Sequence, residues 1–168
     1  MLDRPFTELP NQIKDYCSEI GKNRLLVQGP GGNISWKADN VIWIKASGQW
    51  LAKANDKEIF VPVDLAHLRR CFSQENFNVV PKLKIETILR PSIETAFHAV
   101  LPHRIVVHLH AVEILALLVQ DDCKILTNNL NLSNCIALFL EYYKPGAELA
   151  KKIQNSLYET PNINVIFL

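Results

Sequence analysis

The apolar residues of this chain occur in short runs whose spacing changes repeatedly between the period of a helix and that of a strand. Leu9, Ile13 and Ile20 have the spacing of a helix face, whereas the continuous apolar run 59–63 is typical of a strand. A chain that mixes both kinds of segment along its length folds as a layered α/β or α+β domain. The most apolar stretch, 105–119, is interrupted by two histidines and a glutamate, so it is too short and too polar to span a bilayer.

The expected elements follow one another without an internal repeat or a low-complexity linker, so residues 1–168 are predicted to form a single domain. Helices are expected at 9–20, 65–70, 93–100, 112–119 and 147–157. Gly21 would end the first, Asp64 would cap the second and Ser92 would cap the third. The helix at 112–119 is expected to be buried. Strands are expected at 25–28, 34–36, 41–45, 59–63, 104–110 and 163–168, with 34–36 and 41–45 paired as a hairpin.

Acidic and basic residues nearly balance, since 18 Lys and Arg stand against 17 Asp and Glu and the net charge is +1. A chain that binds nucleic acid usually carries a clear basic excess, so we expect no nucleic-acid partner. The first residues carry charges where a secretory signal needs an apolar run. We therefore expect no targeting peptide, no membrane partner and a cytoplasmic location.

A glycine-rich segment, 29–33, joins the expected strand at 25–28 to the strand that begins at Ile34. Rossmann and P-loop phosphate sites need a helix after their glycines, so this segment belongs to neither class. Its backbone amides are compatible with an anion-binding nest, and a plain tight turn explains the same glycines.

Two histidines, His108 and His110, stand two apart near the end of an apolar strand, so their side chains leave the same face with Cα atoms about 6.5 Å apart. Imidazoles at that spacing can share one zinc ion, and a pair of hydrogen-bonded core histidines is the alternative. Glu94 lies in the first turn of the preceding helix, where the amide dipoles favour a carboxylate with or without a chemical role. His98, four residues later, is expected to be a structural partner rather than a ligand.

Four short motifs occur in the order that resembles the class II aldolase/adducin head family: 32–35 (GNIS), Ser47-Gly48, 91–94 (PSIE) and 107–110 (VHLH). The resemblance covers nearly the whole chain and implies an α/β fold, a three-layer α/β/α domain with a central, largely antiparallel sheet. It implies contacts to a substrate phosphate from Gly32, Asn33, Ser47, Gly48 and Ser92, Zn²⁺ binding by His108 and His110, and an acid/base role for Glu94. Since members are commonly tetramers, it also implies a homo-oligomer.

Two departures from the family pattern bear on the substrate and on the metal. Ile93 stands where the family's phosphate loop often has a second serine, so one phosphate hydroxyl is missing. The family's third zinc histidine follows a late strand, whereas here no histidine follows His110 and the expected strand 163–168 ends the chain. The domain is therefore expected to be C-terminally short, with weaker metal binding than a site with three protein ligands.

The resemblance implies a zinc-dependent aldolase-like lyase that cleaves a ketose phosphate or a related sugar through a metal-stabilised enediolate. A zinc ion can stabilise the charge of the enediolate as a Lewis acid, while a nearby carboxylate moves the proton. One alternative, which the missing third ligand favours, is a non-catalytic interaction module like the adducin head, or an inactive fragment. Another is a sugar-phosphate epimerase or dehydratase, which would use the same enediolate.

Overall fold

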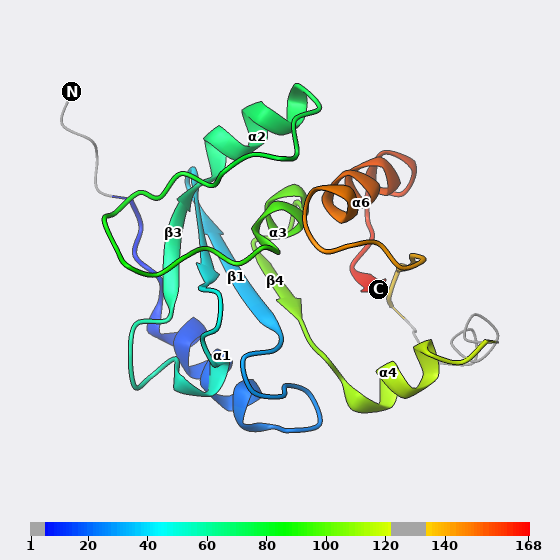
Figure 1. The fold of residues 1–168 in the computed structure, drawn as a ribbon, viewed down its shortest axis with the longest axis horizontal. Helices are drawn as coiled ribbons and strands as arrows, with labels where there is room; N and C mark the ends of the chain where they lie inside the picture. The colour runs from blue at the N-terminus through cyan, green and yellow to red at the C-terminus, as the bar shows by residue number, and fades with distance from the viewer. Residues whose placement is uncertain (1–5, 122–133) are drawn as a thin grey trace.

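A four-stranded antiparallel sheet forms the centre of the chain in a computed structural model that describes residues 6–121 and 134–168 (Figure 1). Its strands lie in the order β3-β2-β1-β4 and comprise β1 (Asn33–Ala38), β2 (Val41–Lys45), β3 (Phe60–Asp64) and β4 (Ile105–His108). β1 and β2 form the hairpin that the sequence predicts, closed by a turn in which Asp39 has a φ of 51°.

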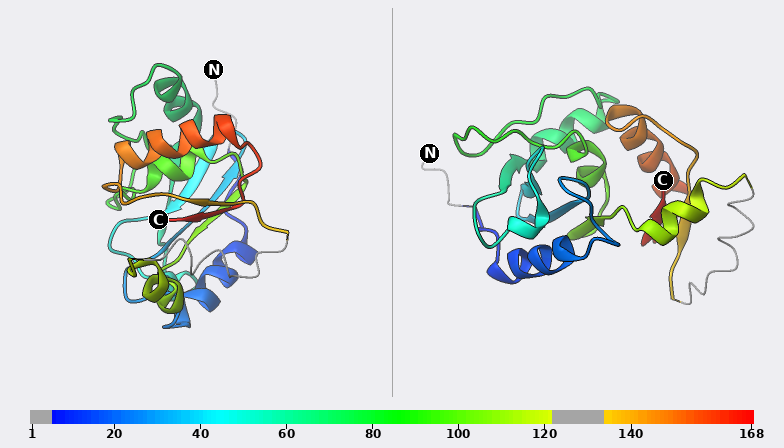
Figure 2. Two further views of the ribbon diagram at one scale, coloured as in Figure 1. Left: turned by 90° about the vertical axis from the view of Figure 1, so that its right-hand side faces the viewer. Right: turned by 60° about the horizontal axis from the view of Figure 1, so that its bottom comes forward.

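Helices cover both faces of this sheet (Figure 2). One face packs against α1 (Asn11–Lys22) and the short 3-10 helix η1 (Leu51–Lys53), and the other against α2 (Leu65–Ser73), α3 (Thr95–Val100) and α6 (Ala147–Glu159). Side chains that alternate along β2 feed the two cores, with Ile42 and Ile44 on the side of α2, α3 and α6 and Trp43 on the side of α1. The three-layer α/β/α architecture predicted from the sequence is confirmed.

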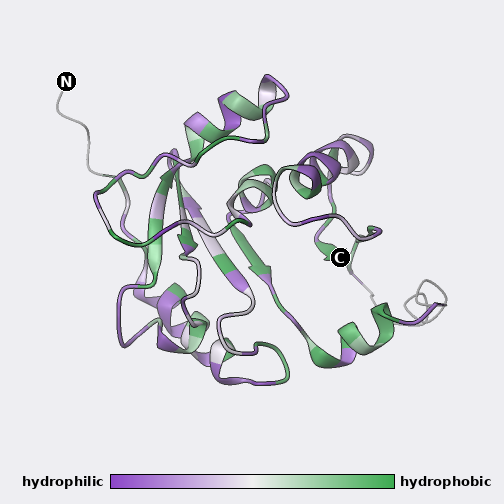
Figure 3. Cartoon of the chain, in the orientation of Figure 1, coloured by the Kyte–Doolittle hydropathy of each residue, from purple (hydrophilic) through white to green (hydrophobic). Residues whose placement is uncertain are grey.

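The C-terminal region is less well buried than the sheet and its flanking helices. α4 (Val112–Leu118) follows β4, and a short parallel pair, β5 (Ala137–Phe139) and β6 (Val165–Phe167), lies next to α6 (Figure 1). None of the residues of α4 is buried, although most of them are hydrophobic (Figure 3). The expectation of a buried helix at 112–119 is therefore wrong, because no other element of the described chain covers it.

Two further sequence expectations are wrong near the N-terminus. Residues 25–28 form no strand, because the amides of Leu26 and Val27 both donate to the carbonyl oxygen of Asn23 and close a turn. Gly21 does not end α1, which continues to Lys22. Gly21 instead lets the helix approach η1 closely, since a Cβ at this position would lie 2.1 Å from the backbone nitrogen of Ala52.

The sequence predicts the start of α2 correctly and places the start of α3 two residues too early. Asp64 caps α2 as predicted, because its carboxylate accepts from the His67 amide at 2.8 Å. α3 begins two residues later than expected, since Ser92 closes a turn: its Oγ accepts from the Glu94 amide and its carbonyl from the Thr95 amide.

In the part of the chain that the structure describes, no helix has both the length and the apolar character needed to cross a membrane.

Candidate functional site

Strand pairing brings the predicted site residues to one end of the sheet. Asn33 begins β1 opposite His108, which ends β4. On the other side of β1, Ser35 pairs with Ile44, so β2 finishes with Lys45 at the same end of the sheet. Antiparallel neighbours always place the start of one strand beside the end of the next. The glycine-rich loop before β1, the loop after β2 and the segment after β4 therefore meet.

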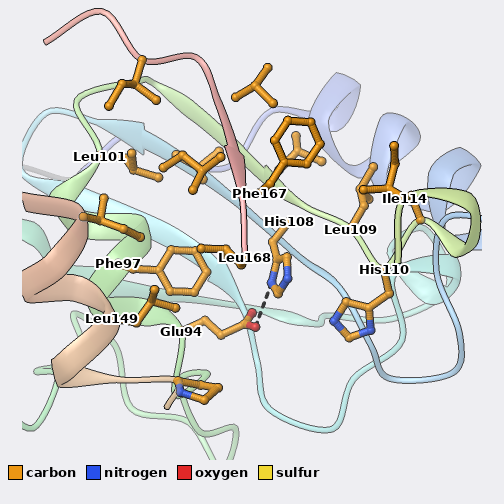
Figure 4. A pocket seen from close by; sticks show the side chains of 18 of the residues that line it. Glu94, Phe97, Leu101, His108, Leu109, His110, Ile114, Leu149, Phe167 and Leu168 are labelled. Atoms are coloured by element: carbon orange, nitrogen blue, oxygen red, sulfur yellow. Dashed lines mark ion pairs between the residues drawn. The ribbon is translucent and has the colours of Figure 1, made fainter. Parts of the chain in front are cut away.

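Glu94 and His108 are in direct contact at this edge (Figure 4). Oε1 of Glu94 lies 2.8 Å from Nδ1 of His108, and both side chains are largely buried. This close contact is not aligned as a hydrogen bond, since the buried Nδ1 has no hydrogen-bond partner among the described residues; a proton on Nδ1 would leave Nε2 with its lone pair free. The ring of His110 lies 5.1 Å from that of His108, centroid to centroid, although His110 is beyond the end of β4. The two imidazoles and the carboxylate thus form one cluster.

The surroundings of Glu94 favour its charged form. Burial alone would raise the pKa of this carboxyl, but its interactions with His108 and Asn33 outweigh burial, so the pKa lies below its usual value. Burial, together with the charge of His108, lowers the pKa of His110. His110 is therefore kept in its neutral form, which is the form that binds metals.

His98 is a structural partner, as the sequence predicts. Its side chain is fully buried, and a 2.8 Å hydrogen bond joins its Nδ1 to Oγ of Ser35 on β1. Burial lowers the pKa of His98 to about 3, so the ring is neutral at physiological pH. Its Nε2 has no hydrogen-bond partner among the described residues.

The residues predicted to contact phosphate lie on three loops that are tied together. The amide of Ser47 donates to the carbonyl of Arg90 at 2.9 Å, and Ala46 forms a β-bridge with Pro91. This brings the loop after β2 against the turn that contains Ser92. The structure gathers Gly32, Asn33, Ser47, Gly48 and Ser92 on these three loops at the edge where Glu94 meets His108.

Two of these residues have features that suit a ligand. Gly32 has a φ of 63°, a left-handed conformation that glycine adopts without strain. Oδ1 of Asn33 is buried and has no hydrogen-bond partner in the described part of the chain. A buried acceptor without a partner costs about 1–3 kcal/mol, so a donor from a ligand or water would stabilise it.

Lys45 belongs to the site, and the sequence analysis missed it. The side chain is 3% exposed, and its Nζ donates to the carbonyls of Pro30 at 2.9 Å and Gln49 at 2.7 Å. Burial lowers the pKa of this lysine, while the charge of Glu94 opposes the shift. Lys45 pairs with no carboxylate in the described chain, so it places a cation between two of the loops. The available signal was a lysine that ends the otherwise apolar strand 41–45.

Gly31 is a second residue that sequence reasoning treated only as part of a turn. A Cβ at this position would lie 2.9 Å from Nδ1 of His110 and 2.9 Å from the carbonyl oxygen of Gln28. The absence of a side chain therefore lets the His110 ring pack directly on the glycine-rich loop. Only the three-dimensional contact shows this, because Gly31 and His110 are far apart in the sequence.

The donor groups of the cluster fit a zinc ion in part. Two imidazoles and a carboxylate are groups that zinc commonly binds. Across residues 6–121 and 134–168, no three or more His, Cys, Asp or Glu side chains are spaced to enclose a metal ion. His108 and His110 thus offer two nitrogens, and Glu94 contacts His108 as carboxylates do when they orient a metal-binding imidazole.

An apolar cavity of about 660 Å³ opens beside the cluster (Figure 4). Glu94, His108 and His110 lie at one side of this cavity, and Phe97 and Leu149 line another part of it. Phe167 and Leu168, at the end of the chain, complete the apolar wall. Small-molecule sites commonly combine such a wall with a few convergent polar groups.

The sequence identifies the class of protein to which this fold and this cluster belong. Residues 11–168 match the family described as Class II Aldolase and Adducin N-terminal domain, so the chain belongs to that family. The resemblance drawn from the four motifs is confirmed.

Solved structures show the same fold. The N-terminal class II aldolase domain of a conserved protein from Thermoplasma acidophilum is 24% identical with a TM-score of 0.74, covering 100% of this chain and 83% of that chain. L-fuculose-1-phosphate aldolase from Thermus thermophilus is 16% identical with a TM-score of 0.52, covering 89% and 72%. YgbL from Klebsiella pneumoniae, a putative aldolase/epimerase/decarboxylase, is 19% identical with a TM-score of 0.58, covering 92% and 73%.

One curated relative is similar in sequence. The chain is 27% identical over 179 residues to YuxG of Bacillus subtilis, described as an uncharacterized oxidoreductase. The match covers 96% of this chain and 26% of YuxG, so the chain spans about a quarter of the length of that relative.

Proposed function

We propose that this domain is a zinc-dependent aldolase-like lyase that cleaves a ketose phosphate or a related sugar. The observation that carries the proposal is the cluster in which Glu94 lies 2.8 Å from His108 and His110 lies beside them. Membership of the class II aldolase family supports an aldolase-like reaction. As part of the same proposal, residues 1–168 act as one domain of a cytoplasmic homo-oligomer, a tetramer by the family resemblance.

His108, through Nε2, and His110 are the residues that would hold the zinc ion. When bound, zinc supplies Lewis-acid stabilisation of the negative charge that develops on the enediolate oxygen. In the metal-bound protein Glu94 would accept a hydrogen bond from Nδ1–H of His108 and so keep the ring in one orientation and one tautomer. Glu94 is also the base: its carboxylate takes the proton from the hydroxyl beside the breaking C–C bond and returns a proton to the carbon fragment.

Phosphate binding is assigned to the three loops at the same edge. Lys45 brings positive charge to the loops, and Gly32, Ser47 and Gly48 bring backbone amides and a hydroxyl. The side chains of Asn33 and Ser92 are the remaining polar groups of this set. Binding energy gained at the phosphate orients the carbons that react near Glu94. Ile93, at the position of the missing serine, offers no hydroxyl to the phosphate.

A second candidate function is a non-catalytic interaction module like the adducin head. It is supported by the absence of a third metal-ligand side chain in the described residues and by exposed apolar side chains on α4 and at its C-cap: Val112, Leu115 and Val119 expose 43%, 40% and 77% of their surface. Exposed apolar side chains that gather on one element are typical of a surface that binds another protein.

The test is a cleavage assay on the zinc-loaded protein with a panel of ketose phosphates, detecting the aldehyde and the triose phosphate formed. Glu94→Gln keeps the shape of the side chain but removes the base, so kcat is expected to fall about 10²–10⁴-fold. Glu113→Gln, which neutralises an exposed carboxylate on α4, is the control and should leave kcat unchanged. Full activity in Glu94→Gln would rule out the assigned proton transfer, and absence of cleavage by a zinc-loaded protein would favour the interaction module.

A further inference from the structure

Three polar residues, Asn33, Ser35 and Lys37, lie on the face of β1 that α3 covers, and we call them the β1 polar stripe. All three are buried, with exposed fractions of 1%, 0% and 6%. They occupy alternate positions of the strand and therefore point the same way. Burying polar side chains at successive positions in an apolar interior is costly unless each has a partner.

Each residue of the stripe contacts a different part of the segment 94–103. Asn33 lies close to the Glu94 carboxylate at the start of α3, and a 2.8 Å hydrogen bond joins Oγ of Ser35 to Nδ1 of His98. Lys37 donates through Nζ to the backbone carbonyls that follow the helix, those of Leu101 and of His103, the latter at 2.9 Å. The stripe thus faces α3 along its whole length and is hydrogen-bonded to its middle and to the residues that follow its end.

The spacings of the strand and the helix match. Alternate residues of a strand lie about 6.6 Å apart. Four residues of an α-helix rise about 6 Å, a similar step, and His98 follows the N-cap residue Glu94 by four positions. Since the three contacts come in the same order on both elements, α3 runs along β1 in a fixed register.

This register decides where Glu94 lies relative to His108. α3 has only six residues, and a helix this short does not hold its place without tertiary contacts. The position of His108 is set independently, because β1 pairs with β4 with Asn33 opposite His108 and Ser35 opposite Val106. A shift of α3 along β1 would therefore carry the Glu94 carboxylate away from Nδ1 of His108.

We propose that Ser35 and His98 are positioning residues that align α3 on β1 and so set the contact between Glu94 and His108. Their effect on the metal rests on the proposed function, since it passes through the orientation of the His108 ring. Lys37 holds the other end of α3 and supports the same register from further away. Both Ser35 and His98 are fully buried, so they act through Glu94 and His108.

The test compares Ser35→Ala with Ser18→Ala. Ser18 is the matched control, because it is also a buried serine, and its Oγ donates to the Ala52 carbonyl at 3.3 Å on the opposite face of the sheet. Three quantities are measured for each: the free energy of unfolding, the zinc dissociation constant by chelator competition, and the imidazole NMR signals of His108 in the metal-free protein.

Ser35→Ala is expected to weaken zinc binding about 10–100-fold, the range for residues that orient a metal ligand, and to move the metal-free His108 signals. Ser18→Ala should change neither, even where both variants lose similar stability. His98→Asn, which keeps a hydrogen-bonding group close to the place of Nδ1, should retain more zinc affinity than His98→Leu.

Equal zinc affinities and unchanged His108 signals in Ser35→Ala and Ser18→Ala would overturn the proposal. If the wild-type chain binds no zinc, the proposed function fails, and the metal-free His108 signals then decide alone. A change in Ser35→Ala that is absent in Ser18→Ala supports the positioning role, and the absence of that change refutes it.

Discussion

Hydrophobic side chains are buried to different extents in two regions of the molecule. One region is built on β1–β4, and the other is formed by α4, β5 and β6. Every residue of β2 is buried, and the sheet has an apolar core on each face. In the C-terminal region, α4 has no buried residue, and none of the three residues of β5 is fully buried. The four-stranded part is thus a packed interior, and the C-terminal region is one wall of a cavity.

The candidate site lies where these two regions meet. Its polar groups, Glu94, His108 and Lys45, come from the four-stranded part, where tight packing restricts side-chain movement. The apolar wall that includes Phe167 comes from the C-terminal region. The chemical groups are therefore held by the well-packed part of the molecule, while the shape of the binding space depends on the less buried C-terminal elements.

The contrast between the two regions is tested most strongly by truncating one leucine in each. Leu68 is fully buried in α2, so Leu68→Ala is expected to lower the free energy of unfolding by about 2–5 kcal/mol through lost burial and a cavity. Leu115 on α4 is 40% exposed, and Leu115→Ala should stay within about 0.5–1 kcal/mol. Urea unfolding of both variants measures the change in the free energy of unfolding. Equal losses of stability in Leu68→Ala and Leu115→Ala would contradict the difference in packing between the two regions.

Gly21 tests how closely the layers of the four-stranded part approach. Alanine in place of glycine at an open helical position stabilises by about 0.5–1 kcal/mol. At Gly21 the added Cβ would meet the backbone of Leu51 and Ala52 within 2.5 Å, so Gly21→Ala is expected to destabilise by about 3 kcal/mol. Thermal and urea unfolding decide the sign, and a stabilised variant would show that α1 and η1 are further apart.

Lys37 gives a smaller effect that depends on pH. Burial, with a contribution from the charge of Arg69, lowers the pKa of Lys37 from 10.5 to about 7. Between these two values the unfolded chain binds more protons than the folded chain, so the free energy of unfolding rises with pH. From pH 7 to pH 9 the wild type should gain about 2 kcal/mol over Lys37→Met. Parallel urea titrations measure this difference, and identical pH profiles would contradict the burial of the ammonium.

Local patterns in the sequence predict much of the fold. The hairpin of β1 and β2 is predicted because turn residues separate two apolar runs, and the start of α2 is predicted because Asp64 is a strong capping residue. His108 and His110 are predicted to lie together because both belong to one extended segment, and their rings are 5.1 Å apart. In each case the responsible residues are neighbours along the chain.

Features that depend on contacts between distant segments were not predicted. Apolar periodicity gives α4 an apolar face but does not say what covers it, so its exposure was missed. The roles of Lys45 and Gly31 depend on loops that meet only in the folded chain. The contact between Ser35 and His98 joins residues 63 positions apart. A single sequence contains no direct signal for such pairings.

The zinc content of the purified chain tests the central claim most directly. It is measured by elemental analysis after zinc is supplied and excess removed, for the wild type, for His108→Ala/His110→Ala and for His67→Ala on α2 as the control. Close to one zinc per chain is expected in the wild type and in His67→Ala, and none in the double variant. No zinc in the wild type, or undiminished zinc in the double variant, would contradict the assignment of His108 and His110 as a metal site.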